Sequence, residues 1–319
     1  MVERIVILAG GVGGAKLVQG FTDSCAPERL AVIGNVADDW EFHGLWVSPD
    51  IDTVTYTLAG LIDETKGWGV RDESFRALEV LNRLGKDTWM QLGDQDLGLH
   101  IYRTERRKKG ERPSLIARDI ATRLGVRVPI LLPTDDPVHT KVQTPDGWLA
   151  FQEYFVRERC KPAVYDVRFD GAESASATPE ALSALGAADL IVIAPSNPVV
   201  SIAPILAVPG IRRAIERSKA LRVAVSPIVG GRTIKGPAAD MMRTMGQSPD
   251  VAGVAAHYRG LIDAFVIDRE DRDHAASLTR DDLAVWVEDS VMRTRDDKQR
   301  LAERILRRAT MEGRKRGAA

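Results

Sequence analysis

Apolar residues fall into short, unbroken runs along the chain, and helix-length stretches with a period near 3.6 residues lie between several of these runs. The runs are rich in Val and Ile and cover residues 5–9, 30–33, 128–132, 164–169, 190–194, 221–225 and 264–267. A strand that is buried on both faces is apolar throughout, and such strands alternating with helices are typical of a parallel sheet. The pattern therefore predicts an α/β fold with a doubly wound, mostly parallel sheet of the Rossmann-like type.

Two stretches depart from this alternation. Residues 53–125 are expected to be helical throughout and to form an insertion near the mouth of the site. Residues 142–156 place a Pro-Asp-Gly sequence between two apolar runs, which is typical of a short hairpin. Residues 293–316 have the spacing of an amphipathic, Arg-rich helix, expected to be a solvated terminal helix. We therefore expect a core over residues 1–270 and a C-terminal extension over 271–319.

A glycine-rich turn follows the first apolar run and opens the first expected helix. Its glycines let backbone N–H groups approach an anion, and the start of the helix adds the positive end of its dipole. The dinucleotide fingerprint is incomplete, because Lys16 stands where the third glycine belongs, and the Gly-Lys-Ser/Thr of a P-loop is absent. A tight turn without a ligand is the alternative. The predicted phosphate-binding residues are Gly11, Val12, Gly13, Gly14 and Lys16.

Carboxylates gather after the second apolar run, between residues 38 and 52. Loops at the carboxyl ends of strands are where open α/β sheets bind ligands, and grouped oxygen ligands suit Mg²⁺ carried on a diphosphate. We expect Asp38, Asp39 and Asp50 to bind Mg²⁺, although Asp38 and Asp39 are alternatively solvated turn residues. Asp52 is expected to cap a helix that begins at Thr53.

The residues around these carboxylates leave further roles open. Trp40 is either a core residue or a stacking surface for a flat heterocycle. Asp94 and Asp96 lie between two expected helices, where either one caps a helix or faces a ligand. His100 follows closely enough to allow a metal cluster with them. No His, Cys or Ser motif of a known covalent mechanism is present.

Two later loops follow apolar runs and carry groups suited to a purine edge or to phosphate. Their candidate residues are Ser196, Asn197, Ser226 and Gly230. Arg232 and Lys235 lie just beyond the second loop and could neutralise phosphate charge. Ordinary strand-to-helix turns are the alternative interpretation of both loops.

Composition limits the partners and the compartment. Lys and Arg total 44 against 45 for Asp and Glu, so no net field attracts nucleic acid or an anionic membrane. Cys25 and Cys160 lie far apart, and no apolar run is long enough to span a membrane. We therefore expect a cytoplasmic protein that binds neither nucleic acid nor membrane. The apolar helix within residues 252–261 suggests a homodimer.

Together these loops resemble those of the transferase family of deazaflavin coenzyme F-420 biosynthesis, the 2-phospho-L-lactate or phosphoenolpyruvate transferases. The matching segments run in order along the chain and comprise residues 10–17, 35–40, 48–53, 92–96, 134–137, 195–198, 226–231 and 236–238. Such an ordered set is more specific than a single glycine-rich loop. The tail beyond residue 270, with Trp286 and its Arg-rich helix, looks like the actinobacterial type.

The resemblance implies a reaction and a division of the site. A phosphoenolpyruvyl or 2-phospholactyl group would pass from a guanosine diphosphate-linked donor to the ribityl hydroxyl of the deazaflavin Fo, releasing GMP and giving dehydro-F-420-0 or F-420-0. The glycine loop and the two later loops would bind guanosine diphosphate, and the acidic loops would hold Mg²⁺. Asp52 and Gln91 fall at positions that contact Fo, and Asp94 and Trp40 are expected beside them.

The chemistry of such a transfer agrees with these residues. It needs in-line placement and charge neutralisation rather than a covalent intermediate. Lys235 and Mg²⁺ would neutralise charge on the diphosphate, and Asp52 would accept the proton of the ribityl hydroxyl.

Two other functions compete. A non-catalytic regulator that binds UDP-sugars is the main alternative, because regulators of the same superfamily share the glycine start and the Asn-Pro loop. A dinucleotide-dependent oxidoreductase is disfavoured by the missing third glycine. The carboxylate-rich loops favour the enzyme, since a sensor would not require them.

Overall fold

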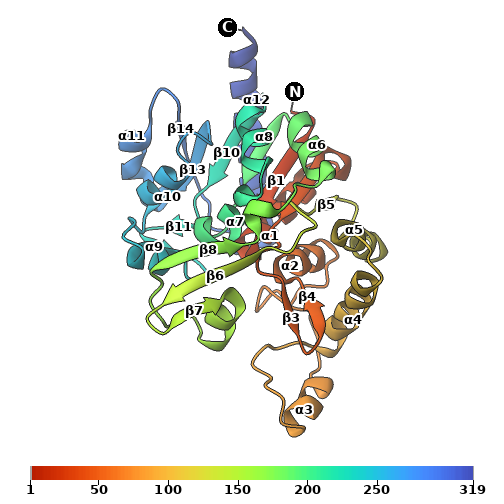
Figure 1. Ribbon diagram of the computed structural model, residues 1–319. Helices are drawn as coiled ribbons and strands as arrows, with labels where there is room; N and C mark the ends of the chain where they lie inside the picture. Colours follow the sequence, from red (N-terminus) through yellow and green to blue (C-terminus); the bar gives the residue numbers. More distant parts are fainter. Residues whose placement is uncertain (1, 319) are drawn as a thin grey trace.

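A seven-stranded parallel sheet forms the centre of the molecule (Figure 1). The computed structural model describes residues 2–318, with side chains described as far as residue 313. The strands lie in the order β14-β13-β10-β9-β1-β2-β5, and each neighbouring pair is parallel. Their bounds are β1 Ile5–Ala9, β2 Leu30–Gly34, β5 Ile130–Leu131, β9 Leu190–Ile193, β10 Leu221–Val225, β13 Ala264–Asp268 and β14 Ala284–Glu288. The expected doubly wound parallel sheet is confirmed.

The order of the strands changes direction between β1 and β9. From β1 the chain continues to β2 and β5 on one side, and the later strands β9, β10, β13 and β14 extend the sheet on the other side. β1 and β9 are direct neighbours, with Leu8 opposite Ile193 near their carboxyl ends. In doubly wound sheets ligands bind outside the strand ends at such a switch point.

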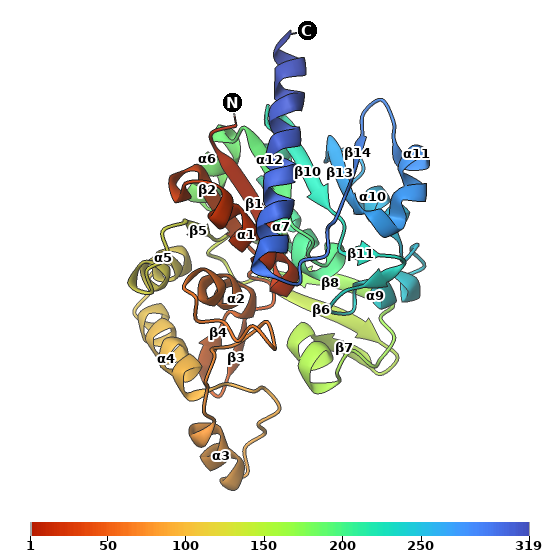
Figure 2. The same ribbon diagram turned by 180° about the vertical axis from the view of Figure 1, so that it is seen from behind.

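Helices cover both faces of the sheet (Figures 1 and 2). Ile5 and Ile7 of β1 pack in one apolar layer, and Val6 and Leu8 pack in the other. The first layer includes α1 Gly11–Ser24, α5 Pro113–Arg123 and α12 Arg295–Ala318. The second includes α6 Pro179–Ala187, η4 Pro198–Ile202, α7 Ala203–Ala207, α8 Ile211–Arg217, α9 Ala238–Thr244, α10 Val251–His257 and α11 Ala275–Leu278.

The C-terminal helix α12 is part of the core, and our expectation of a solvated helix was wrong. It runs alongside α1 (Figure 2), and Leu301 and Ile305 are buried between them. A Cβ placed on Gly20 of α1 would lie 2.1 Å from the Lys298 carbonyl oxygen, so glycine allows this close approach. β14 also pairs with β13, and residues beyond 270 therefore complete the sheet. Arg314 and Arg316, at the end of the expected Arg-rich helix, lie outside the residues whose side chains are described.

The insertion after β2 is only partly helical, so the expectation of continuous helix over residues 53–125 was wrong. It contains α2 Pro49–Leu58, α3 Arg76–Arg83, α4 Asp94–Lys108 and α5, and the segments 59–75 and 84–93 are not helical. Gly60 and Gly85 adopt positive φ where α2 and α3 end. Helix α2 begins at Pro49, which suits a first helical position, and Asp52 lies inside the helix rather than capping it.

Small antiparallel sheets surround the central one. They comprise β3 Trp40–Phe42 with β4 Leu45–Val47, β6 His139–Thr144 with β7 Gly147–Ala150 and β8 Asp166–Asp170, and β11 Ile228–Val229 with β12 Arg232–Thr233. The β6–β7 hairpin is confirmed, but residues 151–157 after it are helical, including η2 Glu153–Arg157. β8 was wrongly assigned to the parallel sheet, because its apolar residues Val167 and Phe169 alternate with charged ones, as in a half-exposed antiparallel strand.

The structure bears on the expected dimer face and on the expected absence of a membrane span. The apolar residues Val251 and Val254 of α10 are buried in the chain's own core, so that helix does not offer the apolar dimer face that we had assumed. The oligomeric state itself stays a prediction. Within residues 2–318 no single helix is long and apolar enough to cross a membrane, although the bent pair Pro198–Ala207 and Ile211–Arg217 passes on length and composition.

Candidate functional site

A cavity of about 480 Å³ lies at the carboxyl edge of the sheet, over the switch point between β1 and β9. The loops after β1, β2, β9 and β10 line one part of it, and helices α2 and α4 line another. The segment after β7, the loop before α9 and residues 68–69, 90–92 and 290–292 complete the wall. We call the part formed by the strand-end loops and by Asp50 in the first turn of α2 the sheet end, and the part formed by Asp52 and Tyr56 of α2 with α4 the insertion end.

The glycine turn at the sheet end is held by carboxylate and hydroxyl groups. The Gly11 N–H at the start of α1 donates to Asp50 Oδ1 at 2.8 Å. The Ser196 hydroxyl accepts from the Gly10 N–H and donates to the Gly10 carbonyl. A Cβ on Gly13 would lie 2.3 Å from the Pro195 carbonyl oxygen, so a glycine is required where α1 meets the loop after β9.

Asp38 and Asp50 face the cavity at the sheet end. Burial raises the pKa of Asp50 to about 6. Hydrogen bonds from the Asn35 amide and the Gly11 N–H act in the opposite direction and lower this pKa, but burial outweighs them. Burial and the neighbouring Asp50 charge hold the pKa of Asp38 well above its ordinary value. Asp38 Oδ1 is buried without a hydrogen-bond partner among the described residues. The two carboxylates thus form a strongly desolvated pair that a cation would stabilise.

Asp39 points away from this pair. Its Oδ2 accepts hydrogen bonds from Trp46 Nε1 at 3.0 Å and from the Ser48 hydroxyl at 2.7 Å. It lies beside Arg103 and Arg107 in a separate small pocket, and burial raises its pKa to about 7. The structure therefore brings together Asp38 and Asp50 of the predicted metal ligands, and it does not place Asp39 in the cavity.

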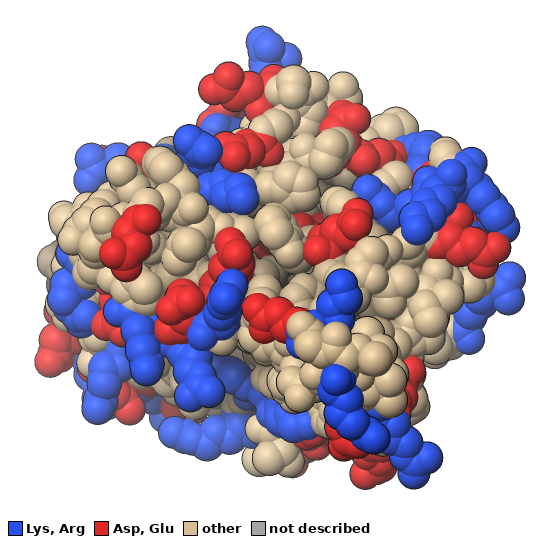
Figure 3. Space-filling model, turned by 60° about the horizontal axis from the view of Figure 1, so that its bottom comes forward, with Lys and Arg blue, Asp and Glu red and all other residues tan. Residues whose placement is uncertain are grey.

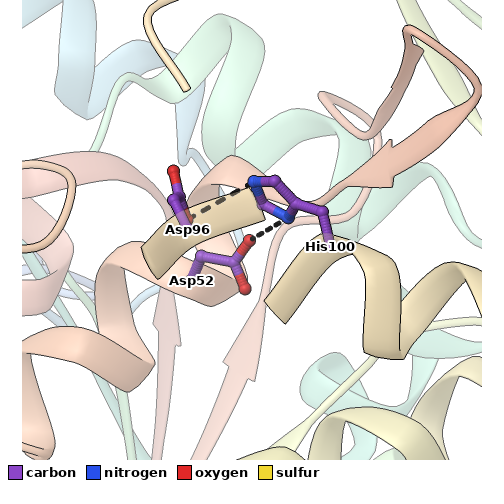
Figure 4. A group of neighbouring side chains, drawn as sticks. All are labelled: Asp52, Asp96 and His100. Atoms are coloured by element: carbon purple, nitrogen blue, oxygen red, sulfur yellow. Dashed lines mark ion pairs between the residues drawn. The ribbon is translucent and has the colours of Figure 1, made fainter. Parts of the chain in front are cut away.

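Asp52, Asp96 and His100 meet at the insertion end (Figure 4). His100 lies between the carboxylates, with Nε2 at 3.4 Å from Asp96 Oδ1 and Nδ1 at 3.9 Å from Asp52 Oδ2. The ligand atoms of this group lie within 4.8 Å of one another, so the group could hold a metal ion. Burial would raise the pKa of Asp96, but hydrogen bonds from His100 and Tyr56 outweigh it and leave that pKa below its ordinary value.

Arg103 already supplies a positive charge to this group. Its guanidinium is buried and forms a two-pronged ion pair with Asp52. Its Nη1 also lies 3.2 Å from His100 Nδ1. Because a guanidinium can only donate, Nδ1 accepts and the imidazole is left to carry its proton on Nε2, facing Asp96. His100 thus faces Arg103 through Nδ1 and Asp96 through Nε2.

The residues predicted for the donor divide into two groups. Those that line the cavity are Gly11, Val12, Gly13, Lys16, Asn197, Ser226 and Lys235. The others support its walls: Ser196 holds the glycine turn, and a Cβ on Gly14 would lie 2.7 Å from the Ser196 hydroxyl. The Gly230 N–H donates to the Asp271 carboxylate outside the cavity.

Some of the lining residues already have protein partners. Asn197 Oδ1 accepts from the Val199 N–H at 2.9 Å and caps η4. Lys16 Nζ donates to the Met292 carbonyl at 3.0 Å, and Lys235 Nζ donates to the carbonyl of Lys66. The lysines are thus held at the cavity by backbone oxygens that an anionic ligand would replace.

The residues predicted for the acceptor also divide. Asp52 and Gln91 line the cavity, but Asp94 and Trp40 do not. The Asp94 carboxylate accepts from the Ser74 hydroxyl and from the N–H groups of Arg76 and Ala77, so it caps α3. The Trp40 ring lies 5.1 Å from Lys141 Nζ and edge-on to His139.

Sequence reasoning missed Tyr56 and Arg103. Tyr56 donates to Asp96, and Arg103 pairs with Asp52. Helical spacing could have indicated both, because Tyr56 follows Asp52 by one turn, and His100 and Arg103 repeat the face of Asp96. The contact between the two helices could not be inferred from spacing.

The surface around the lower part of the molecule carries both signs of charge. Figure 3 shows Lys and Arg side chains interspersed with Asp and Glu, and uncharged surface between them. This mixture fits the net charge of -1. Binding of an anionic ligand at this cavity would therefore depend on local groups such as the glycine turn, Lys16 and Lys235.

Comparison with known proteins identifies the family of the chain. A family model described as 2-phospho-L-lactate transferase CofD matches residues 5–309. A 2-phospho-L-lactate transferase of Methanopyrus kandleri is 41% identical over 306 residues, covering 95% of this chain and 97% of that protein. A phosphoenolpyruvate transferase of Streptomyces coelicolor is 43% identical over 276 residues, covering 85% of this chain and 86% of that protein.

A solved structure supports the fold alone. It is that of a UPF0052-family protein of Bacillus halodurans, with a TM-score of 0.62 and 19% identity over 96% of this chain and 99% of that one. The sequence relatives and the family model together confirm the resemblance drawn from the loops. The chain belongs to the 2-phospho-L-lactate transferase CofD family.

Proposed function

We propose that this protein transfers a phosphoenolpyruvyl or 2-phospholactyl group from a guanosine diphosphate-linked donor to the ribityl hydroxyl of Fo, giving dehydro-F-420-0 or F-420-0 and GMP. The observation that carries the proposal is one cavity with two differently built ends. The sheet end offers the helix start at Gly11 and two buried carboxylates, which suit a metal-bound diphosphate. The insertion end offers Asp52 and Asp96, which suit hydroxyl groups.

The metal is proposed to be Mg²⁺ held by Asp38 and Asp50. Asp38 Oδ1 has no hydrogen-bond partner among the described residues, and oxygen ligands are those that Mg²⁺ prefers. At the Asp52 group, in contrast, Arg103 already neutralises one carboxylate and donates to His100. When bound, Mg²⁺ would neutralise charge on the diphosphate.

The chain's own residues would place the reacting groups. Asp52, fixed by Arg103, would accept the proton of the ribityl hydroxyl. Lys235 and Lys16 would move from their carbonyl partners to the donor phosphates. Asn197 and Ser226 would face the nucleotide from the loops after β9 and β10. We propose a cytoplasmic enzyme acting on small molecules, and a homodimer.

A transfer assay tests the function and its metal. Purified protein is incubated with Fo and each donor, with and without EDTA, and the product is identified by mass spectrometry. EDTA should abolish transfer, and Asp50→Asn should lower turnover by about 10³-fold, the scale of losing charge stabilisation in the transition state. Asp87→Asn is the matched control, because the Asp87 side chain is 59% exposed and its ion pair among the described residues is with Arg157 at 3.5 Å.

The outcomes separate the parts of the proposal. Full activity in EDTA would reject the metal. Failure to turn over either donor, with a UDP-sugar retained through native purification, would favour the non-catalytic regulator. The relative rates with the two donors decide which acid is transferred.

A further inference from the structure

The cavity carries exposed aromatic side chains that neither polar end explains. Trp68 and Phe155 both line it, and each is 41% exposed. They come from separate segments, the loop after α2 and the helical turn after β7. Single exposed apolar residues are ordinary on a protein surface, but a group that shares one cavity marks a binding surface. Ile234 also lines the cavity and is 60% exposed.

The loop that carries Trp68 is fixed to the insertion end. The Ile62 N–H donates to the Tyr56 carbonyl at 3.1 Å, in the last turn of α2, and Ile62 pairs with Val70 across the base of the loop. Tyr56 is also the residue that donates to Asp96. The loop that carries Trp68 is therefore anchored to α2, the helix that carries Asp52 and contacts Asp96 through Tyr56.

The indole is held in place from one side. Lys66 Nζ lies 5.6 Å from the Trp68 ring centroid, within the range of a cation–π contact. The adjacent Gly67 has φ of +78°, and a Cβ placed on it would lie 2.8 Å from Val12 of the glycine turn. The loop thus spans from the end of α2 to the start of α1, and Trp68, which lines the cavity, follows the glycine that approaches Val12.

On the basis of the proposed function, we propose that Trp68 is the platform on which the flat deazaflavin ring of the acceptor stacks. A flat and nearly uncharged ring gains from burying an aromatic face that is exposed without it. A ring stacked on Trp68 would leave its polar ribityl chain beside Asp52 and Asp96, which line the same cavity. Phe155 supplies a second apolar wall. Trp68 thus takes the stacking role that the sequence left open for Trp40, which does not line the cavity.

Equilibrium binding of Fo, followed by deazaflavin fluorescence, tests the proposal with GDP binding as the reference. Trp68→Ala should weaken Fo by about 5- to 100-fold, the range for loss of a stacked ring on an aromatic side chain. Trp68→Phe should stay within about threefold of wild type, because a smaller ring still stacks. In turnover assays the loss should appear in KM for Fo, with kcat at saturating Fo nearly unchanged.

Trp148→Ala is the matched control. Trp148 is 37% exposed and has Arg168 at 4.3 Å from its ring centroid, but it does not line the cavity. The Trp148→Ala variant should leave Fo affinity unchanged. For Trp68→Ala, an unchanged GDP affinity shows that the fold is intact.

The proposal is overturned if Trp68→Ala keeps wild-type Fo affinity, or if Trp68→Phe is as weak as Trp68→Ala. A loss of GDP affinity with Fo retained would also overturn it and would assign the platform to guanine. Wild-type protein that transfers no group to Fo and binds none would overturn the proposed function together with this inference. Transfer to Fo by wild type with no effect of Trp68→Ala would reject the platform alone.

Discussion

The two ends of the cavity are built by different means. The sheet end is made mainly of backbone: a Cβ on Gly10 would lie 2.6 Å from Asp50 Oδ2, a Cβ on Gly13 would lie 2.3 Å from the Pro195 carbonyl oxygen, and Gly11 has a φ of +61°. The insertion end is made of side chains on α2 and α4, joined by the buried ion pair of Asp52 and Arg103. The first end therefore depends on steric fit of the main chain, and the second depends on charge balance away from water.

The largest expected effect is on the charge balance of the insertion end. Arg103→Met leaves Asp52 buried without its partner, and removal of one member of a buried pair costs about 3–5 kcal/mol of unfolding free energy. Denaturant unfolding of the variant measures this loss. The double variant Arg103→Met/Asp52→Asn removes both charges and should recover a large part of it.

This result would separate a charge effect from a packing effect. If the double variant is as unstable as Arg103→Met alone, the loss comes from the missing guanidinium contacts, and the ion pair does not organise the insertion end. A loss below about 1 kcal/mol in the single variant would place the pair in the weak class of exposed ion pairs.

Asp39 tests the boundary between the two ends, because it follows Asp38 of the sheet end and lies beside Arg103 of the insertion end. Burial raises its pKa to about 7 in the folded chain, from an ordinary value of 3.8. At a pH between these two values, the Asp39 carboxyl therefore keeps its proton in the folded state and has lost it in the unfolded state. Its stabilising contribution is complete below the ordinary value and is lost as pH rises through about 7.

The wild type should therefore lose more stability than Asp39→Asn between about pH 5 and pH 8, by about 2–4 kcal/mol. Unfolding free energies of the metal-free proteins at both pH values measure the difference. Asn keeps an oxygen for the Trp46 and Ser48 hydrogen bonds, so packing is preserved. Equal pH slopes for the two proteins would mean that Asp39 is ionised throughout, paired with Arg103.

The sheet end should respond to steric change. Gly13→Ala puts a Cβ at 2.3 Å from the Pro195 carbonyl oxygen, so the loop after β9 must move away from the start of α1. We expect GDP affinity to fall by the equivalent of about 1–3 kcal/mol, the usual cost of overpacking, with Fo affinity nearly unchanged. Calorimetry with each ligand measures the two affinities.

The control for this change is Gly98→Ala in α4. Among the described residues, no atom outside the adjoining helix backbone lies within 4 Å of a Cβ placed there, so the variant should bind both ligands as the wild type does and gain helix stability. Equal loss of GDP and Fo in Gly13→Ala would show that the two ends do not respond independently.

The same contrast explains what the sequence could predict. The apolar runs and the glycine turn are local patterns, and they were sufficient to predict the parallel sheet and the helix start at its edge. The pairing of Asp52 with Arg103 joins residues 51 positions apart on two helices, and no local pattern specifies that contact. Burial of α12 was missed because an Arg-rich exposed face dominates its composition, although Leu301 and Ile305 follow helical spacing.

The smallest expected effect concerns Asp94, which lies two residues before Asp96 but serves a different purpose. Asp94 caps α3 through the N–H groups of Arg76 and Ala77 and does not line the cavity, whereas Asp96 lines it. Asp94→Ala should therefore speed hydrogen exchange of the α3 amides, because the cap is lost, and leave Fo affinity at the wild-type value. Asp96→Asn should do the reverse, weakening Fo with no change at α3. Weaker Fo binding in Asp94→Ala, with α3 exchange unchanged, would mean that the insertion end reaches farther along α4 than its cavity residues indicate.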